Sequence, residues 1–376
     1  MDSILKATAS YEAWLMEHMG EAGDLNAFGA KHRLMKEGEF PFFRATFYRW
    51  AQRWKEEAEE LATDPTPRLL SIGDVHVENF GTWRDDEGRL VWGANDFDEA
   101  SELAWTSDLV RLATSALLAA ESNTVPMTPQ EICGRISSGY RRQMEAGKQA
   151  RPFILAEENP ELVTLMNAAR KDPAVFWDKL RTKKTALASE VPPSAQAALI
   201  SALPKDISDK VEWREINPAA SPPGMGSIGR RRYYAIAHWG GAWMAREAKA
   251  LAPSANAWAL GDSSGSIHIG TLLDNAVRSP DPWFEWRGDW LVRRLAPDAV
   301  KANFSDVDSP ALDKRTAKKL FDAMGAETAN IHLGGGKTAE ILQDFGSRTG
   351  NNEDWLWDAA KKWRNKLRND FTQYAG

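Results

Sequence analysis

The stretch of sequence that decides the fold spans residues 69–112 and reads LLSIGDVHVENFGTWRDDEGRLVWGANDFDEASELAWTSDLVRL. It contains two short apolar runs, 69–72 and 90–92, which are typical of buried strands. Each run leads into a polar cluster, and the segment 85–88 between them has the composition of a turn. We expect the two runs to pair as a hairpin, which would bring both polar clusters to the same end. From Asp108 onwards the pattern predicts a helix.

The two polar clusters have a spacing that suits phosphate or metal chemistry. The first contains Asp74, His76, Glu78 and Asn79, and the second contains Asn95, Asp96, Asp98 and Glu99. An Asp after one strand, an Asn five residues later and an Asp-x-Asp after the next strand can hold a divalent cation or orient a hydroxyl nucleophile. The structural alternative is capping and turn chemistry, for which Asp and Asn are common after strands.

This stretch resembles the catalytic centre of kinase-like small-molecule phosphotransferases, such as aminoglycoside and choline kinases. Those enzymes carry a Gly-Asp-x-His-x-x-Asn loop, then a hydrophobic-Asp-Phe-x-Asp-Ala strand end, then a structural Asp that opens a helix. The matching residues here are Gly73, Asp74, His76, Asn79, Asp96, Phe97, Asp98, Ala100 and Asp108. The resemblance implies an ATP- and Mg²⁺-dependent phosphotransferase that acts on the hydroxyl or amine group of a small molecule.

The chain is also similar, over most of its length, to the bacterial domain-of-unknown-function 2252 family, which is uncharacterised. Four stretches carry this likeness: FPFFRATF (40–47), GDVHVENFG to SDLVRLATS (73–115), GMGSIGRRRYY with MAREAKALAPSA (224–255), and LFDAMGAETANIHL (320–333). The family name implies no activity, so the function has to be argued from the residues.

Composition bounds the class of protein. The 376 residues are enough for two or three domains, and 43% hydrophobic with 27% charged residues is ordinary for a globular protein. A net charge of −6 argues against a nucleic-acid or anionic-membrane surface as the main partner. The single cysteine, Cys133, excludes an intramolecular disulfide. With no signal-peptide pattern and no apolar run of about 20 residues, we expect a cytoplasmic protein; its oligomeric state is not indicated.

The rest of the chain alternates between helical and strand patterns. Residues 1–66 predict helices, interrupted at 40–44 by an aromatic loop in which Arg44 either packs on the core or faces a phosphate or substrate. Helices are also predicted at 105–150, through most of 152–203, and from 310 to the end. Strands are predicted at 211–216, 233–239, 242–248 and 290–295, with Gly240-Gly241 as a turn, whereas 255–283 gives no clear pattern.

A Gly-x-Gly-x-x-Gly sequence lies between two of these predicted strands and contains Gly224, Gly226, Ser227 and Gly229. Because no helix follows it, the loop does not fit a dinucleotide-binding motif. It fits a hairpin that covers the phosphates of a nucleotide, where glycines let backbone N–H groups approach phosphate oxygens.

A kinase also needs a cation on the strand after that hairpin, and two residues qualify, Arg246 and Lys249. They are three positions apart, so a regular strand would point them to opposite faces. Lysine is the usual phosphate-reaching residue, a compact charge on a flexible stem, and we favour Lys249.

The order of these parts is inverted relative to kinases, because the acidic clusters precede the glycine loop. We therefore predict an α+β protein with a circularly permuted, protein-kinase-like two-lobe fold. Residues 1–205 would form a helical lobe with the catalytic and metal-binding hairpin, 206–300 a small strand-rich lobe over the nucleotide, and 301–376 helices that complete the large lobe. The glycine loop is then expected to lie over the acidic clusters.

Each polar residue receives an expected role from this interpretation. Asp74 would act as the base or orienter for the acceptor hydroxyl. Asn79 and Asp96 would hold Mg²⁺, and Asp98 would add a second metal ligand. His76 would hold the loop by hydrogen bonds. Two further residues are given supporting roles: Glu78 behind the ligands, and Asp108 as an anchor for the backbone of the catalytic loop.

Three other functions compete with this one. The same residues would serve transfer of AMP in place of the γ-phosphoryl group, and a non-catalytic nucleotide-binding module would not need Asp74. A metal-dependent phosphoesterase also begins with Gly-Asp-x-His, but it needs further histidines in contexts that His18, His32, His238, His268 and His332 lack. The acceptor stays open: acids such as Glu99 and Glu102 would suit a cationic one, and aromatics a sugar.

Overall fold

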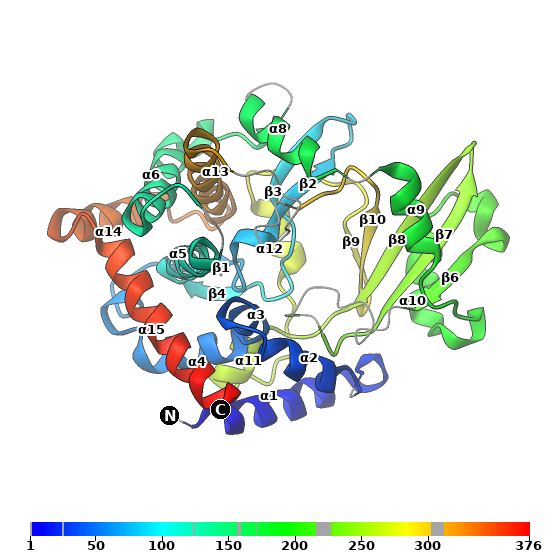
Figure 1. Ribbon diagram of the computed structural model, residues 1–376, viewed down its shortest axis with the longest axis horizontal. Helices are drawn as coiled ribbons and strands as arrows, with labels where there is room; N and C mark the ends of the chain where they lie inside the picture. The colour runs from blue at the N-terminus through cyan, green and yellow to red at the C-terminus, as the bar shows by residue number, and fades with distance from the viewer. Residues whose placement is uncertain are drawn as a thin grey trace.

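The computed structural model describes residues 2–24, 26–122, 125–155, 159–170, 172–215, 226, 228–301 and 312–376. It is a mixed α+β fold, as predicted. Figure 1 shows one set of helices gathered on one side of strands β1–β4, and a separate twisted sheet on the other side. Within the described ranges, the strands form antiparallel sheets of two, three and five strands.

Helices make up the larger part of the molecule. The N-terminal ones are α1 (Ile4–Met19), α2 (Ala27–Met35), α3 (Glu39–Ala45) and α4 (Phe47–Glu57). The middle ones are α5 (Trp105–Ser122), α6 (Pro129–Ala146), α8 (Pro160–Ala168), α9 (Pro173–Arg181) and α10 (Pro193–Ser201). The C-terminal ones are α13 (Lys314–Leu333), α14 (Thr338–Asn351) and α15 (Trp355–Ala375). These ranges confirm the helical segments predicted from the sequence.

The predicted aromatic loop at 40–44 is wrong, because these residues form helix α3. Pro41 is the third residue of the helix, where the backbone N–H has no intrahelical partner, so proline is tolerated there. The rings of Phe40, Phe42 and Phe43 are buried in the core. Arg44, on the last turn, is only partly buried and points towards the polar loop after β1.

The C-terminal helices pack against the middle helices, as predicted. Helix α13 runs along α6, and α15 packs against α5 (Figure 1). Two glycines make the first crossing possible. A Cβ on Gly139 would lie 1.9 Å from the carbonyl oxygen of Asp322, and one on Gly325 would lie 2.0 Å from that of Ile136. The two backbones therefore touch directly at a point where no other residue type fits.

The strand pairing around the acidic clusters differs from the predicted hairpin. Strand β1 (Arg68–Ser71) pairs with β4 (Ser101–Ala104), whereas β3 (Leu90–Ala94) pairs with β2 (Phe80–Arg84) and with the short β5 (Phe153–Ile154). The tight turn at 85–88 joins β3 to its nearest neighbour in sequence, β2, whose sequence has no clear strand pattern. The two polar clusters nevertheless meet, because the backbone N–H of Asn95 donates to the backbone carbonyl of Asn79 over 2.9 Å.

The five-stranded sheet has the order β6-β7-β8-β10-β9. Its strands are β6 (Glu212–Glu215), β7 (Arg232–Trp239), β8 (Ala242–Ala250), β9 (Glu285–Arg287) and β10 (Trp290–Leu295). Gly240 and Gly241 both have positive φ and form the predicted two-residue turn. Helices α11 (Ala255–Leu260) and α12 (Ile269–Asn275) lie between β8 and β9, in the region without a clear sequence pattern.

Helix α10 packs against β7, β8 and β10 of this sheet. The Trp290 indole donates to the Ser194 hydroxyl over 3.0 Å, which ties the helix to strand β10. By contact, α10 therefore belongs with the small sheet, whereas the predicted boundary at 205 assigns it to the helical lobe.

Candidate functional site

The loop after β1 is held by a carboxylate at the start of α5. The backbone amides of Ile72 and Gly73 donate to Asp108 over 2.8 and 3.0 Å. Gly73 has φ +81°, and a Cβ there would lie 2.3 Å from the Glu99 carbonyl oxygen, so this tight loop requires glycine. Asp108 thus anchors the backbone of the loop, as predicted.

Two further side chains extend this anchor into the helical core. The Nε2 atom of His332 lies 3.2 Å from Asp108 Oδ2, and its Nδ1 atom lies 2.8 Å from the Tyr140 hydroxyl. A carboxylate only accepts, so Nε2 carries the proton and Nδ1 accepts from the tyrosine. All three side chains are fully buried. Helices α5, α6 and α13 therefore jointly fix the loop.

Asp74 faces an arginine that was not singled out from the sequence. Arg111 donates to Asp74 Oδ1 from Nε over 3.1 Å and also from a terminal nitrogen. Its guanidinium lies 4.0 Å from the ring centroid of Phe43, so it is fixed from two sides. Burial raises the pKa of Asp74 to about 6, against the opposing effect of Arg111. A carboxylate whose pKa is near neutrality is suited to accept a proton.

Asn79 and His76 complete the first cluster. The side-chain nitrogen of Asn79, Nδ2, donates to the backbone carbonyl of Asp74 over 2.8 Å. The side-chain oxygen of Asn79, Oδ1, therefore points away from that contact. Asn79 Oδ1 is buried and accepts no hydrogen bond from any described residue. His76 Nδ1 accepts from the Glu78 amide over 3.2 Å, which is the predicted loop-holding bond. Burial lowers the pKa of His76 well below its usual value, so the ring is neutral.

The second cluster is held by cations from the small sheet. Lys249 Nζ lies 3.4 Å from Asp96 Oδ1 and also pairs with Asp98 Oδ2. Arg230 reaches the same Asp98 oxygen over 3.2 Å, which leaves Asp98 Oδ1 buried without a donor among the described residues. Burial opposes ionisation of Asp96, but Lys249 and neighbouring cations outweigh it and lower its pKa. The carboxylate is therefore ionised at neutral pH.

Of the glycine loop, Gly226 and Gly229 are within the described ranges, and Gly224 and Ser227 are outside them. A Cβ on Gly226 would lie 3.0 Å from Asp74 Oδ2, so Gly226 itself packs against this carboxylate. Gly229 has φ +107° and packs instead on the ring of Phe28 in α2. Gly226 is thus brought to the acidic clusters, and Gly229 is not.

The two candidate cations of β8 point to opposite faces of the sheet, as their spacing predicts. Lys249 faces the acidic clusters. Arg246 lies on the other face, where its Nε donates to the Ala202 carbonyl over 3.0 Å and its guanidinium lies 4.1 Å from the Trp283 ring centroid. Burial lowers the pKa of Arg246 to about 10. The structure therefore brings Lys249, and not Arg246, to the predicted site.

Besides Lys249, other cations near the site were not predicted from the sequence: Arg111, Arg230, Arg293 and Lys301. For Arg111 a signal exists, because a lone charge in the apolar run LVRLATSALLAA needs a buried partner. Arg293 and Lys301 could not be anticipated, since their position depends on how β10 meets the acidic clusters.

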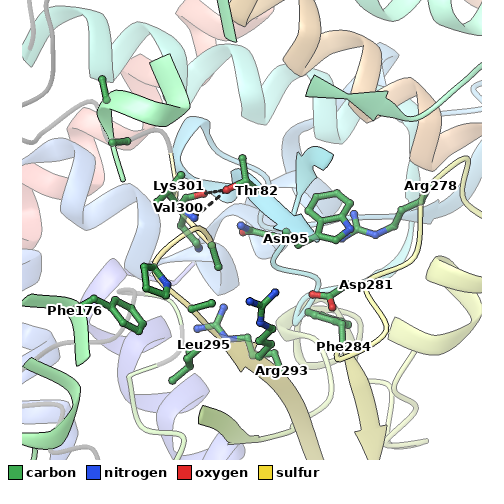
Figure 2. Close-up of a pocket in the computed structure, with 17 residues that line it drawn as sticks. Thr82, Asn95, Phe176, Arg278, Asp281, Phe284, Arg293, Leu295, Val300 and Lys301 are labelled. Carbon is green, nitrogen blue, oxygen red and sulfur yellow. Dashed lines mark hydrogen bonds between the residues drawn. The ribbon is translucent and has the colours of Figure 1, made fainter. Parts of the chain in front are cut away.

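A cavity of about 550 Å³ opens beside the second cluster (Figure 2). Thr82 and Asn95 line it from the β2–β3 hairpin, and Arg293 and Leu295 line it from β10. Lys301, six residues beyond β10, lines it where the chain passes Gly81. The cavity therefore lies between the small sheet and the strands that carry the acidic clusters.

The donor set around Asp96 fits a magnesium ion that is shared with a phosphate ligand. Within the described residues, no group of three or more His, Cys, Asp or Glu side chains is arranged as a closed metal site. Magnesium commonly takes only one or two protein carboxylates together with phosphate oxygens and waters. Asn79 Oδ1 and Asp98 Oδ1, two buried oxygens that accept no hydrogen bond from the described residues, and the ionised Asp96 are oxygen donors of the kind that magnesium binds.

The fold and site define an α+β protein with two acidic clusters and, beside them, a cation-lined cavity between a helical region and a small antiparallel sheet. Residues 25–191 match the model of a family described as an uncharacterized protein conserved in bacteria, DUF2252. This segment includes two of the four stretches that carry the resemblance, 40–47 and 73–115, but neither 224–255 nor 320–333. Searches of curated proteins and of solved structures found no match. No helix in the described ranges has the length and apolar character needed to cross a membrane.

Proposed function

We propose that this protein is an ATP- and Mg²⁺-dependent transferase that moves the γ-phosphoryl group to a hydroxyl or amine group of a small molecule. One observation carries the proposal: Gly226 lies over Asp74, and Lys249 pairs with Asp96 although the two are 153 positions apart in the chain. A glycine loop over the phosphates, a lysine on the third strand, a catalytic Asp, and a metal-binding Asn and Asp are the parts that protein kinases combine.

The small sheet and the helical region are, on this proposal, the two lobes of a permuted kinase-like fold. The arrangement of the small sheet supports it. The segment that contains Gly226 joins β6 to β7, and Lys249 lies on the next strand, β8, which are the positions of these parts in protein kinases. The acidic clusters precede this sheet in the chain. Such a permutation is physically tolerable when the new connections run through exposed loops.

Each residue acts through the atom that the fold leaves available. Asp74 Oδ2 is the oxygen not bound by Arg111, and it would orient the acceptor and receive its proton. Asn79 and Asp96 would hold Mg²⁺, with Asp98 as a further ligand, and the ion would neutralise charge on the phosphates. Lys249 would contact a phosphate oxygen, and the cavity beside Asn95 would receive the nucleotide.

Transfer of AMP is the second candidate, and two cations favour it. Arg293 and Lys301 line the cavity on the β10 side. The uncharged nucleobase of ATP would not pair with these two cations, whereas its phosphates would. A nucleotide bound with its terminal phosphates on that side would present its α-phosphorus to Asp74. The two reactions give acceptor products of different mass.

The test combines binding with turnover. We expect Asp96→Asn to weaken Mg²⁺-dependent ATP binding in a titration, and Asp74→Asn to leave that binding nearly unchanged. In a metabolite-library screen for ATP consumption, Asp74→Asn should lower turnover by about two orders of magnitude or more, the scale of acid–base and orientation effects. Product mass separates phosphate from AMP transfer. Unchanged turnover in Asp74→Asn would contradict the role of Asp74 as base or orienter. Wild-type protein that binds no MgATP would contradict the proposal as a whole.

A further inference from the structure

Arg44 lies at the junction of the acidic loop and the glycine loop. It lies in the last turn of helix α3. Its guanidinium pairs with Glu78 of the acidic loop, with 2.5 Å between Nη1 of the arginine and Oε2 of the glutamate. Its own carbonyl oxygen would lie 3.2 Å from a Cβ on Gly226, the same glycine that covers Asp74. Arg44 and Asp74 are therefore both in contact with one residue of the loop.

One donor of this arginine is unsatisfied. The Nε atom of Arg44 is buried, and no oxygen of the described residues accepts its hydrogen bond. Buried polar groups are rarely left in this state, and an unmet donor next to a site points to a ligand oxygen. The side chain as a whole is 20% exposed, so part of it borders solvent. Its charge also lowers the pKa of Asp74 and that of Lys301, so both groups lie within electrostatic range of Arg44.

We propose that Arg44 is a catalytic residue that contacts the phosphoryl group during its transfer, through the donor that Glu78 does not occupy. This inference rests on the proposed function and adds to it a residue that acts in the transition state. The Glu78 contact orients the planar guanidinium, and its Nε donor remains for a ligand oxygen. Phosphate oxygens match the fork geometry and the charge of arginine.

The reaction in which Arg44 would act needs only the acceptor, ATP and Asp74. The acceptor oxygen or nitrogen forms a bond to the γ-phosphorus, and the bond from that phosphorus to the β–γ bridging oxygen breaks. The acceptor proton passes to Asp74, and ADP leaves with the bonding electrons. Because charge is spread over the three equatorial oxygens in a loose transition state, a fixed arginine stabilises that state more than the ground state.

The test needs no knowledge of the acceptor. ADP with Mg²⁺ and aluminium fluoride mimics the phosphoryl group in transfer, whereas MgATP represents the ground state. We expect Arg44→Gln to bind MgATP within about threefold of wild type but to lose about 10³-fold of the extra affinity for the aluminium fluoride complex, the lower range for a catalytic arginine. Lys249→Ala should weaken both ligands together. Arg44→Lys keeps the charge without the fork and should retain part of the extra affinity.

A matched variant at Arg53 controls for a general loss of folding. Arg53 is also largely buried and ion-paired, to Asp370 and Glu57, and touches neither loop, so Arg53→Gln should leave both affinities unchanged in folded protein. If Arg44→Gln does not fold, the comparison of Arg44→Lys with Arg53→Gln decides. An unchanged aluminium fluoride affinity in a folded Arg44 variant, with normal loss in Lys249→Ala, overturns the role of Arg44 alone. Wild-type protein that binds neither ligand overturns the proposed function and this inference with it.

Discussion

Two nitrogens of Arg111 converge on a single oxygen of Asp74, Oδ1, and leave the other oxygen, Oδ2, beneath Gly226. Arg111 is 1% exposed, and aromatic rings pack against its guanidinium. The carboxylate is therefore held in one orientation by a group that cannot itself move. This arrangement assigns different tasks to the two oxygens: one is bound to the protein, and the other is available to a substrate.

We expect Arg111→Lys to lower turnover by roughly 10- to 100-fold without changing MgATP affinity, because lysine keeps the charge but lacks the planar fork. The measurement is steady-state kinetics with thermal unfolding as the folding control. The double variant Asp74→Asn/Arg111→Lys should be no slower than Asp74→Asn alone, since both changes act through one carboxylate. Additive losses would show that Arg111 acts independently of Asp74.

The two cations of β8 give a paired comparison on one strand. Lys249→Ala should weaken MgATP binding by about tenfold or more in a titration, which is about 1.4 kcal/mol for a lost contact to a charged group. Arg246→Ala removes a side chain on the opposite face of the sheet and should lower the unfolding temperature while leaving nucleotide affinity unchanged. A reversed ranking would mean that the register of β8 differs from the one described.

The crossing of α6 and α13 can be tested with alanine. Gly139→Ala forces a methyl group against the backbone of α13, and we expect it to destabilise the protein by about 1–3 kcal/mol in denaturant unfolding. Gly134 lies on the same helix with no atom within 4 Å of an added Cβ. Gly134→Ala should therefore stabilise the protein by roughly 0.5–1 kcal/mol through helix propensity alone. Equal effects at both positions would contradict the close approach of the two helices.

Glu327 predicts a pH dependence of stability. This residue of α13 is 2% exposed and accepts hydrogen bonds from the Ala94 amide and from Asn330, each over 3.2 Å. Burial raises the pKa of Glu327 to about 7, above its usual value of about 4.5. The folded protein thus holds this proton more tightly than the unfolded chain does. The stability from Glu327 is complete below pH 4.5 and is lost as the pH rises through about 7.

Glu327→Gln should remove this contribution. Between pH 5 and pH 8, the free energy of unfolding of the wild type relative to the variant should fall, by at most about 1.4 kcal/mol per unit of pKa shift. The comparison with the variant cancels the other carboxylates, many of which change stability in the opposite direction. Parallel pH profiles of the two proteins would show that Glu327 has an ordinary pKa in the folded state.

The sequence predicted the elements whose signal is local. The strands predicted at 233–239 and 290–295, the Gly240-Gly241 turn and the C-terminal helices all have clear periodicity or turn chemistry, and the structure confirms them. The pairing of β1 with β4 was not predicted, because it depends on contacts between segments rather than on either segment. Helix α3 was missed because the aromatic run at 40–44 was interpreted as a loop, although the first turn of a helix accepts the proline within it.

The same distinction applies to the candidate site. Asp74, Asn79 and Asp96 were singled out because the motif spacing is local, and Asp108 was correctly given a structural role. Strand alternation predicts that Lys249 and Arg246 point to opposite faces of the sheet. It does not say which of the two faces the acidic clusters, because that depends on the register of β8 against β10. The positions of Arg293 and Lys301 follow from the placement of the small sheet, which no pattern within their own segments encodes.

The link from Asp108 through His332 to Tyr140 has a consequence for how the protein is made. On the ribosome, the segment with the acidic clusters emerges more than two hundred residues before His332, as the 224-residue separation of this pair requires. Until α13 has been synthesised and has docked on α6, the carboxylate that fixes the loop at Gly73 lacks its histidine partner. The geometry of the candidate site is therefore completed late in synthesis, because a nascent chain that already carries every acidic residue of the motif still lacks the histidine partner of Asp108.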